Sequence, residues 1–267
     1  MSSSTTSQQE RYTLHYWPQI PGRGEFVRLC FELTKHQYID STDIPRFQAL
    51  LLSSVPASGQ PTHFAPPILE VASSESKEPF YISQTPAILN FLAPRLGLLG
   101  DAHALSGLDR EVAQSQILQL CLVALDLNNE VHDTHHPIAV AKYYEEQKDE
   151  ALKKAQDVRD SRIPKFFKFF QLNLMAQSAG SGGRLYGSKT TVADLVVFQV
   201  VDGLKFAFPT YMKGLEASSK FDAVFQLHAD ISKELSDYLG SSRRRPYSDG
   251  VFRYYPELDG PAPKNLA

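Results

Sequence analysis

The chain has 267 residues, a hydrophobic fraction of 42% and a formal net charge of −3. This length allows one large domain or two small ones, and the hydrophobic content excludes a disordered chain. The charge balance shows no basic excess, so we expect no nucleic-acid partner. Residues 1–10 are polar and lack the apolar core of a signal peptide, which predicts a disordered arm. No apolar run is long enough to cross a membrane, so we expect no membrane partner and a soluble, cytoplasmic protein.

The first ordered element is a strand over residues 12–17, where apolar and polar residues alternate. Prolines and glycines in residues 18–24 end it, and a helix follows with an apolar stripe. Tyr16 therefore lies at the end of a strand and beside a helix N-terminus. A phenol there can donate a hydrogen bond to an anion placed over the helix dipole. The apolar stripe consists of Phe26, Leu29, Cys30 and Leu33.

Two further strands are expected at residues 68–71 and 80–83, and the first of them follows Ala65-Pro66-Pro67. A proline that enters a strand cannot donate to the ladder, so it marks a sheet edge or a special peptide bond. The segment resembles the strand entry of thioredoxin-like proteins, in which this position is a cis-proline, so the resemblance favours a cis bond before Pro67. A cis bond before Pro66 and an ordinary trans loop are the alternatives.

A helix is expected after the last of these strands, with Thr85 as its N-cap and Pro86 in its first turn. The free N–H groups of such a helix start favour a carboxylate.

The pattern changes near residue 97. Before it, short strands and helices alternate in a unit too small for a doubly wound sheet, which predicts a thioredoxin-like layer. From residue 108 to about 245 the pattern is helical. Thr191 and Asp194 form a capping box before a helix that is apolar nearly all round. The tail, residues 246–267, is rich in aromatic residues and is expected to pack back on the body.

Three smaller features have structural interpretations. The histidines of residues 132–136 are expected to satisfy a helix end or to line a pocket, and we expect no catalytic metal. The basic run 243–245 is expected to be a solvated helix end or loop. Two cysteines are too few for a disulfide framework, so Cys30 and Cys121 are interpreted as buried free thiols.

Together, the strand with Tyr16, the Pro66-Pro67 strand entry, the Gln84-Thr85 pair and the Thr191–Asp194 capping box resemble the glutathione S-transferase family. The N-terminal motif is similar to tyrosine-type members of the sigma and mu classes. The resemblance covers about residues 11–258 and implies an α/β plus all-α fold. A thioredoxin-like glutathione-binding domain would span residues 11–97, followed by an all-helical domain over residues 108–245.

The resemblance also implies roles for individual residues. Tyr16 is expected to be the catalytic residue that stabilises the glutathione thiolate. Arg46 and His63 are candidates for the glycyl carboxylate, because the tryptophan that many members use beside glutathione is missing. A pocket for the acceptor substrate is expected at Gln19, Ile20, His132 and His136. The expected glutathione-binding residues are Trp17, Arg23, Ala65, Pro66, Pro67, Gln84 and Thr85.

The resemblance implies a glutathione transferase with a detoxification role, which joins glutathione, its co-substrate, to a small hydrophobic electrophile. A homodimer is expected by the same likeness. A glutathione-dependent isomerase or a biosynthetic enzyme that forms C–S bonds is the first alternative. A non-catalytic binding protein that keeps only the fold is the second.

Overall fold

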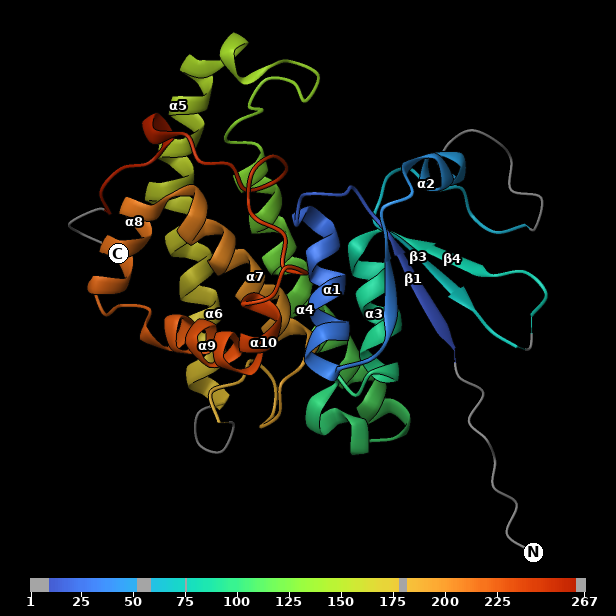
Figure 1. The fold of residues 1–267 in the computed structure, drawn as a ribbon. Helices are drawn as coiled ribbons and strands as arrows, with labels where there is room; N and C mark the ends of the chain where they lie inside the picture. The colour runs from blue at the N-terminus through green and yellow to red at the C-terminus, as the bar shows by residue number, and fades with distance from the viewer. Residues whose placement is uncertain (1–9, 52–58, 75, 178–181, 263–267) are drawn as a thin grey trace, which may run out of the picture.

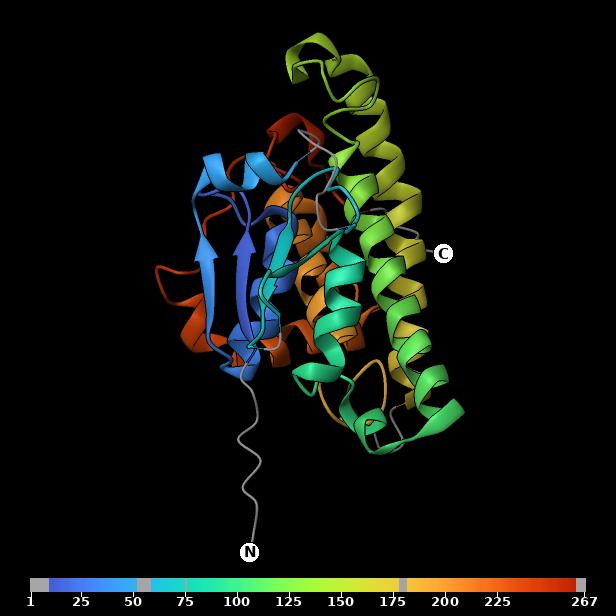
Figure 2. The same ribbon diagram turned by 90° about the vertical axis from the view of Figure 1, so that its right-hand side faces the viewer.

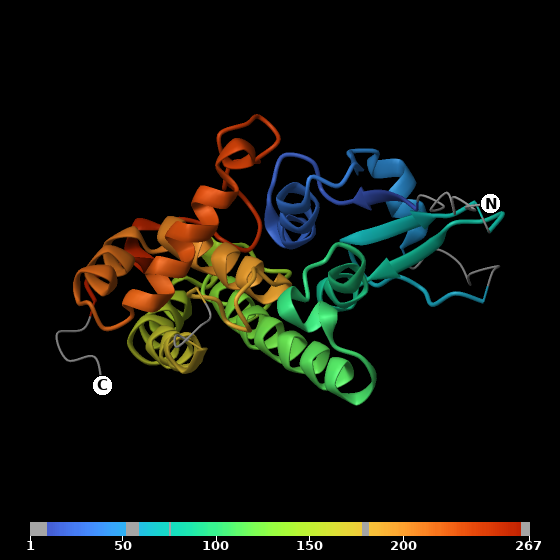
Figure 3. The ribbon, with the colours of Figure 1, turned by 90° about the horizontal axis from the view of Figure 1, so that it is seen from below.

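The computed structural model describes residues 10–51, 59–74, 76–177 and 182–262. The predicted N-terminal arm lies outside the described residues, except for its last position. The described chain forms a small α/β domain and a helical domain packed side by side (Figure 1). Figures 2 and 3 show the same two parts from the side and from below, with the long helix α4 (Gly107–His132) running along their boundary. The predicted α/β plus all-α architecture is confirmed.

The first domain contains a four-stranded sheet with the strand order β2-β1-β3-β4. β1 pairs in parallel with β2, whereas the β1–β3 and β3–β4 pairs are antiparallel. Three of these strands agree with the sequence predictions. β2 was missed because its second half, Asp40-Ser41, is polar and breaks the apolar pattern of a strand. The strands are β1 (Arg11–His15), β2 (Tyr38–Ser41), β3 (Ile68–Ala72) and β4 (Phe80–Ser83).

Helices cover the two faces of this sheet differently. Leu69 and Val71 of β3 face α1 (Glu25–Thr34) and α3 (Thr85–Arg95), with which they form a core cluster. The intervening Glu70 faces the opposite side and pairs with Arg46 of α2 (Ile44–Leu50), a helix the sequence did not reveal. This alternation is the two-residue period of a strand. Because α1 and α3 lie between the sheet and the helical domain, the first helix is buried almost all round.

The second domain is helical throughout, and its described residues contain no strand. At its centre, α7 (Val192–Ala207) is buried nearly all round, as predicted. The capping box is confirmed, since the Asp194 carboxylate accepts hydrogen bonds from the Thr191 N–H (2.7 Å) and hydroxyl (2.9 Å). The helices after α4 are α5 (Lys148–Asp157), α6 (Ile163–Gln177), α7 (Val192–Ala207), α8 (Pro209–Ala217), α9 (Asp222–Glu234) and α10 (Ser236–Leu239). A π-helical turn, Val158–Arg162, joins α5 to α6.

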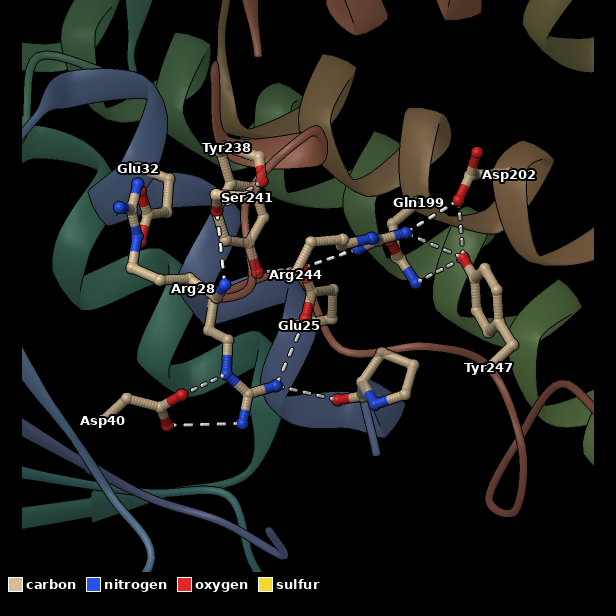
Figure 4. A network of polar contacts seen from close by, with 12 residues as sticks. Glu25, Arg28, Glu32, Asp40, Gln199, Asp202, Tyr238, Ser241, Arg244 and Tyr247 are labelled. Carbon is tan, nitrogen blue, oxygen red and sulfur yellow. Dashed lines mark hydrogen bonds and ion pairs between the residues drawn. The ribbon is translucent and has the colours of Figure 1, made fainter. Parts of the chain in front are cut away.

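A polar network joins the two domains (Figure 4). Glu25 of α1 has a side chain with no exposed surface, and it pairs with Arg28 (3.2 Å) and with Arg244 (2.5 Å). The Tyr238 hydroxyl donates to the same carboxylate at 2.6 Å. Arg244 also reaches Asp202 of α7 at 2.7 Å. The chain segment after α10 is therefore tied to both domains through buried charges.

The expectation that the run Arg243–Arg245 is solvated is wrong for two of its members. Arg244 and Arg245 are 10% and 12% exposed, and only Arg243 is mostly exposed, at 60%. Each of the three pairs with a carboxylate of the first domain. The sequence pattern missed this because the partners lie more than 200 residues earlier in the chain.

The tail beyond residue 246 lies against the helical domain. Phe252 is 3% exposed and packs on Gly203 of α7 so closely that a Cβ at that position would overlap its ring. Leu258 is also buried, and Arg159 donates to its carbonyl oxygen. Both cysteines are buried free thiols, as predicted. Over the residues that the structure describes, no helix has both the length and the apolar character needed to cross a membrane.

Candidate active site

Tyr16 follows β1 and packs under the turn that starts α1. Its side chain is 6% exposed, and its hydroxyl oxygen accepts a hydrogen bond from the Arg23 N–H at 2.8 Å. Gly22 and Gly24 make room for the ring, because a Cβ at Gly24 would lie 2.6 Å from the Tyr16 Cγ. The glycines that end the strand in the sequence thus serve a second purpose. They let the helix start approach the phenol.

The environment of Tyr16 keeps the phenol protonated at neutral pH. Burial raises its pKa, while the Arg23 N–H and the charges of Arg23 and Arg28 oppose that rise. The Arg28 guanidinium lies 5.7 Å from the centre of the Tyr16 ring. Among the described residues, no acceptor takes the proton of the Tyr16 hydroxyl. A phenol in this state is a free hydrogen-bond donor with its oxygen held in place.

A cavity of about 660 Å³ lies between the two domains, next to this turn. Arg23 forms part of its wall, so the Tyr16 hydroxyl, which itself does not line the cavity, is hydrogen-bonded to the main chain of a lining residue. Two loops of the first domain and one face of α4 complete the wall. The other lining residues are Phe64, Ala65, Pro66, Pro67, Gln84, Thr85, Pro86, Leu122, Leu125, Asp126, Asn129, His132, Asp133 and Val140.

The peptide bond between Pro66 and Pro67 is cis, which confirms the favoured interpretation of this motif. Both prolines line the cavity just before β3. Pro66 has no N–H, so its main chain offers a ligand only the carbonyl oxygen.

The start of α3 presents polar groups to the same cavity. The helix begins at Thr85, so the expectation that Thr85 is the N-cap is wrong, and Gln84 occupies that position with φ 71°. A left-handed conformation at a residue other than glycine is unfavourable, and such strain is found most often at functional sites. The Thr85 hydroxyl is buried and has no hydrogen-bond partner. An unpaired hydroxyl beside free helix N–H groups is a suitable site for a carboxylate.

One face of α4 closes the cavity from the second domain. Arg23 donates from Nη1 to the Asn129 side-chain oxygen at 2.8 Å, which links the Tyr16 turn to this helix. The lining positions of α4 recur every three or four residues, as one face of a helix does. Sequence reasoning missed all of them except His132. The sequence shows that these positions share one face of a helix, but it does not show which face of α4 packs against the first domain.

Several predicted site residues lie outside the cavity wall. Trp17 packs edge-on against Phe47, with ring centres 4.9 Å apart, and Gln19 and Ile20 are also not among the lining residues. Arg46 pairs with Glu70 at 2.9 Å, and His63 contacts the Ser83 hydroxyl at 3.0 Å. Neither lines the cavity, so their assignment to the glycyl carboxylate stays a prediction.

Three histidines form a cluster at the end of α4. The rings of His132, His135 and His136 have centres 4.8–5.1 Å apart. Burial lowers the pKa of all three, so they are neutral at neutral pH. His132 lines the cavity, and His136 lines a neighbouring one. No group of three potential ligands in the described part of the chain has an arrangement that could hold a metal ion.

Residues 132–242 match the family model described as "Glutathione S-transferase, C-terminal domain". This match makes the second domain similar to the C-terminal domain of glutathione S-transferases. No curated protein matches the chain in sequence. Glutathione is the co-substrate of this family, and the cavity described above lies between the domain that the model covers and the thioredoxin-like domain.

Solved glutathione S-transferases share the fold at low sequence identity. A sigma class enzyme of Fasciola hepatica has a TM-score of 0.62 and 18% identity, over 90% of this chain and 98% of its own. A pi class enzyme of Onchocerca volvulus has a TM-score of 0.59 and 21% identity, over 85% and 91%. The prostaglandin synthase D of Nilaparvata lugens has a TM-score of 0.55 and 15% identity, over 89% and 100%. The likeness extends over both domains.

Proposed function

We propose that the protein is a glutathione transferase in which the Tyr16 phenol stabilises the glutathione thiolate for attack on a hydrophobic electrophile. One observation carries the proposal. The Tyr16 hydroxyl accepts a hydrogen bond from the N–H of Arg23, a residue that lines the cavity together with Pro66 and the start of α3. Its proton has no acceptor among the described residues and is available to a sulfur anion.

The energy required is within reach of these groups. A free thiol ionises near pH ~8.5, and lowering its pKa to about 6.5 requires about 2.7 kcal/mol of preferential stabilisation of the anion. A hydrogen bond from a phenol to an anion contributes about 1.5–3 kcal/mol. The N-terminus of α1 adds about 0.3–1 kcal/mol through the helix dipole. The positive charges of Arg23 and Arg28, close to the phenol, act in the same direction.

Binding of the tripeptide would use the polar groups along the cavity wall. The start of α3, with Gln84 and the unpaired Thr85 hydroxyl, suits the γ-glutamyl carboxylate. The carbonyl oxygen of Pro66 can accept a hydrogen bond from the cysteinyl N–H. Because Pro66 has no N–H, it cannot donate the reciprocal hydrogen bond to the cysteinyl carbonyl oxygen. We therefore expect weaker glutathione binding than in a relative with an ordinary residue at this position.

The acceptor side of the cavity supports an apolar electrophile. Phe64, Leu122 and Val140 line it and are 75%, 42% and 69% exposed. Exposed apolar side chains gathered in a concave surface mark a binding site for an apolar group. We further propose that the protein acts in the cytoplasm as a homodimer, and that conjugation of such electrophiles serves detoxification.

A second candidate is a glutathione-dependent isomerase or an enzyme that forms a C–S bond in biosynthesis. The observation that favours it is the polar group of side chains, Asp126, His132 and Asp133, on the α4 side of the same cavity. Such a lining suits one defined substrate better than a broad range of apolar ones. One of the proteins with this fold is itself named a prostaglandin synthase.

The test measures glutathione binding by calorimetry and then conjugation of a generic aryl halide by the wild type, Tyr16→Phe and Tyr12→Phe. Tyr12 is a matched control, since it is a buried tyrosine of β1, the strand that Tyr16 follows, and its hydroxyl contacts Glu10 instead of the α1 turn. We expect turnover to fall about tenfold to a hundredfold in Tyr16→Phe only. Binding without turnover of generic acceptors would favour the second candidate or a binding protein. Absence of glutathione binding would refute both enzymatic functions.

A further inference from the structure

A second cavity, of about 330 Å³, adjoins the first at the end of α4. Val140 lines both cavities. His132 of the first cavity stacks on His136 of the second, with ring centres 5.0 Å apart and planes inclined by 28°. A ligand in the first cavity could therefore extend past Val140 into the second.

One wall of the second cavity is a loop whose shape is set by a buried glutamine. Gln147 is 1% exposed, and its side-chain oxygen accepts from the Ile138 N–H at 2.9 Å and the Ala139 N–H at 3.3 Å. Its side-chain nitrogen donates to the carbonyl oxygens of Ala139 and Lys142, both at 3.1 Å. These hydrogen bonds of a single side chain hold the loop in one conformation, so the wall is preformed.

The opposite wall is the C-terminal tail, which two contacts fasten on either side of Arg253. His135 donates from Nε2 to the Val251 carbonyl oxygen at 3.0 Å. Tyr255 stacks on Tyr144, with ring centres 3.8 Å apart. Because Arg253 lies between these two contacts, its side chain is held at the cavity, which it lines together with both tyrosines.

The charge of this cavity is positive although the chain as a whole carries −3. The Arg253 Nε donates to the Gly250 carbonyl oxygen at 3.2 Å, and no carboxylate within the described ranges pairs with this guanidinium. Lys142, across the cavity, likewise has no ion-pair partner there. Glu145 is the one acidic side chain among the lining residues described. Two unpaired cations facing one carboxylate favour an anionic ligand.

Resting on the proposed function, we propose that the second cavity binds the carboxylate end of an amphipathic acceptor, with Arg253 as the main charged contact. The apolar part of the acceptor would lie in the first cavity against Leu122 and Val140. An arginine is well suited to this role, because its planar guanidinium can bind both carboxylate oxygens. The acceptor class is thereby narrowed from hydrophobic electrophiles in general to those that carry a carboxylate at the end of an apolar chain.

The test compares decanoate with 1-decanol, its uncharged counterpart, by titration calorimetry on the full chain. We expect the wild type to bind decanoate more tightly than decanol. Arg253→Gln should weaken decanoate binding about tenfold and leave decanol binding unchanged. The matched control is Arg110→Gln in the first turn of α4, whose other end carries His132. If Arg253→Gln unfolds the tail, Lys142→Gln provides the same comparison, with a smaller loss for decanoate.

Equal binding of decanoate and decanol by the wild type would overturn the proposal. So would equal behaviour of the Arg253 and Arg110 variants. This comparison needs no glutathione, so it decides the ligand class of the cavity even if glutathione binding fails. In turnover, an enone with a terminal carboxylate should show a KM about tenfold higher with Arg253→Gln, while its methyl ester should not. An equal change in KM for acid and ester would also contradict the proposal.

Discussion

Arg244 and Glu25 form a buried ion pair, 2.5 Å long, that joins the segment after α10 to the first helix of the thioredoxin-like domain. The Glu25 side chain has no exposed surface, and that of Arg244 is 10% exposed. Burying two charges is costly, but removing one partner costs more because it leaves the other charge unpaired. The pair therefore acts chiefly to fix how the two domains sit against each other, and with them the cavity between them.

The three neighbouring arginines should differ strongly in their effect on stability. Arg244→Gln is expected to lower the free energy of unfolding by about 3–5 kcal/mol, because Glu25 and Asp202 both lose a buried partner. Arg243→Gln should cost less than about 1 kcal/mol, since its pair with Glu32 lies at the surface. Urea unfolding measured for both variants checks this. Equal losses would show that burial does not decide the contribution of these pairs.

Arg245 is expected to position the segment that follows Tyr16. It donates to the Trp17 carbonyl oxygen at 2.9 Å and pairs with Asp40. Arg28, on the same Asp40 carboxylate, donates to the Pro21 carbonyl oxygen at 3.1 Å. Both ends of the segment between β1 and α1 are thus held through one carboxylate.

Arg245→Gln should lower kcat on the order of tenfold, because small displacements of a reacting group are costly. The rise of kcat/KM with pH should also move to higher pH, as the thiolate loses its fixed donor, Tyr16. Arg243→Gln, two residues earlier, is the matched control and should change neither quantity. A change in stability without a shift of the pH profile would mean that Arg245 has only a structural role.

Removing the Thr85 hydroxyl should have opposite effects on folding and binding. The hydroxyl is buried without a partner, so Thr85→Val should leave the melting temperature unchanged or raise it. The affinity of the same variant for glutathione should be lower by about tenfold or more, since a hydrogen bond to a carboxylate is lost. Thr85→Ser keeps the hydroxyl and should bind like the wild type. Unchanged affinity in Thr85→Val would place the carboxylate elsewhere.

Local patterns predicted much of the fold. The first helix, the Thr191–Asp194 capping box and three of the four strands follow from periodicity and turn residues, which depend on neighbours in sequence. β2 was missed because half of it, Asp40-Ser41, is polar, and α2 was missed because it is short. α2 in particular is set by its Asp43 cap, which accepts from the Arg46 N–H at 3.0 Å.

The sequence predicted the cavity residues that come from the first domain, but not those that come from the helical domain. Arg23, Pro67 and Thr85 lie in or beside turns with strong local signals, and they line the cavity as a group. Asn129 and the rest of the α4 face carry no such signal, because their role depends on how two distant segments pack. The pairing of Arg244 with Glu25 was unpredictable for the same reason.

The histidine cluster should make stability depend on pH between neutrality and about pH 4.5. Burial lowers the pKa of His135 from 6.5 to about 3, and burial also lowers those of His132 and His136. The unfolded chain therefore binds protons that the folded chain does not, and stability is lost as pH falls below the unfolded value near 6.5. Carboxylates with a lowered pKa, such as Asp202, contribute to the loss of stability only at lower pH.

His135→Gln isolates this effect, because glutamine can still donate to the Val251 carbonyl oxygen but does not titrate in this range. The melting temperature of the wild type should fall steadily from pH 7 to pH 4.5, and that of the variant should fall clearly less. His103→Gln is the control, since His103 lies on an exposed turn outside the cluster. Parallel curves for all three proteins would show that other groups control the pH dependence, and that the neutral state of His135 adds nothing to the anchoring of the tail beside Arg253.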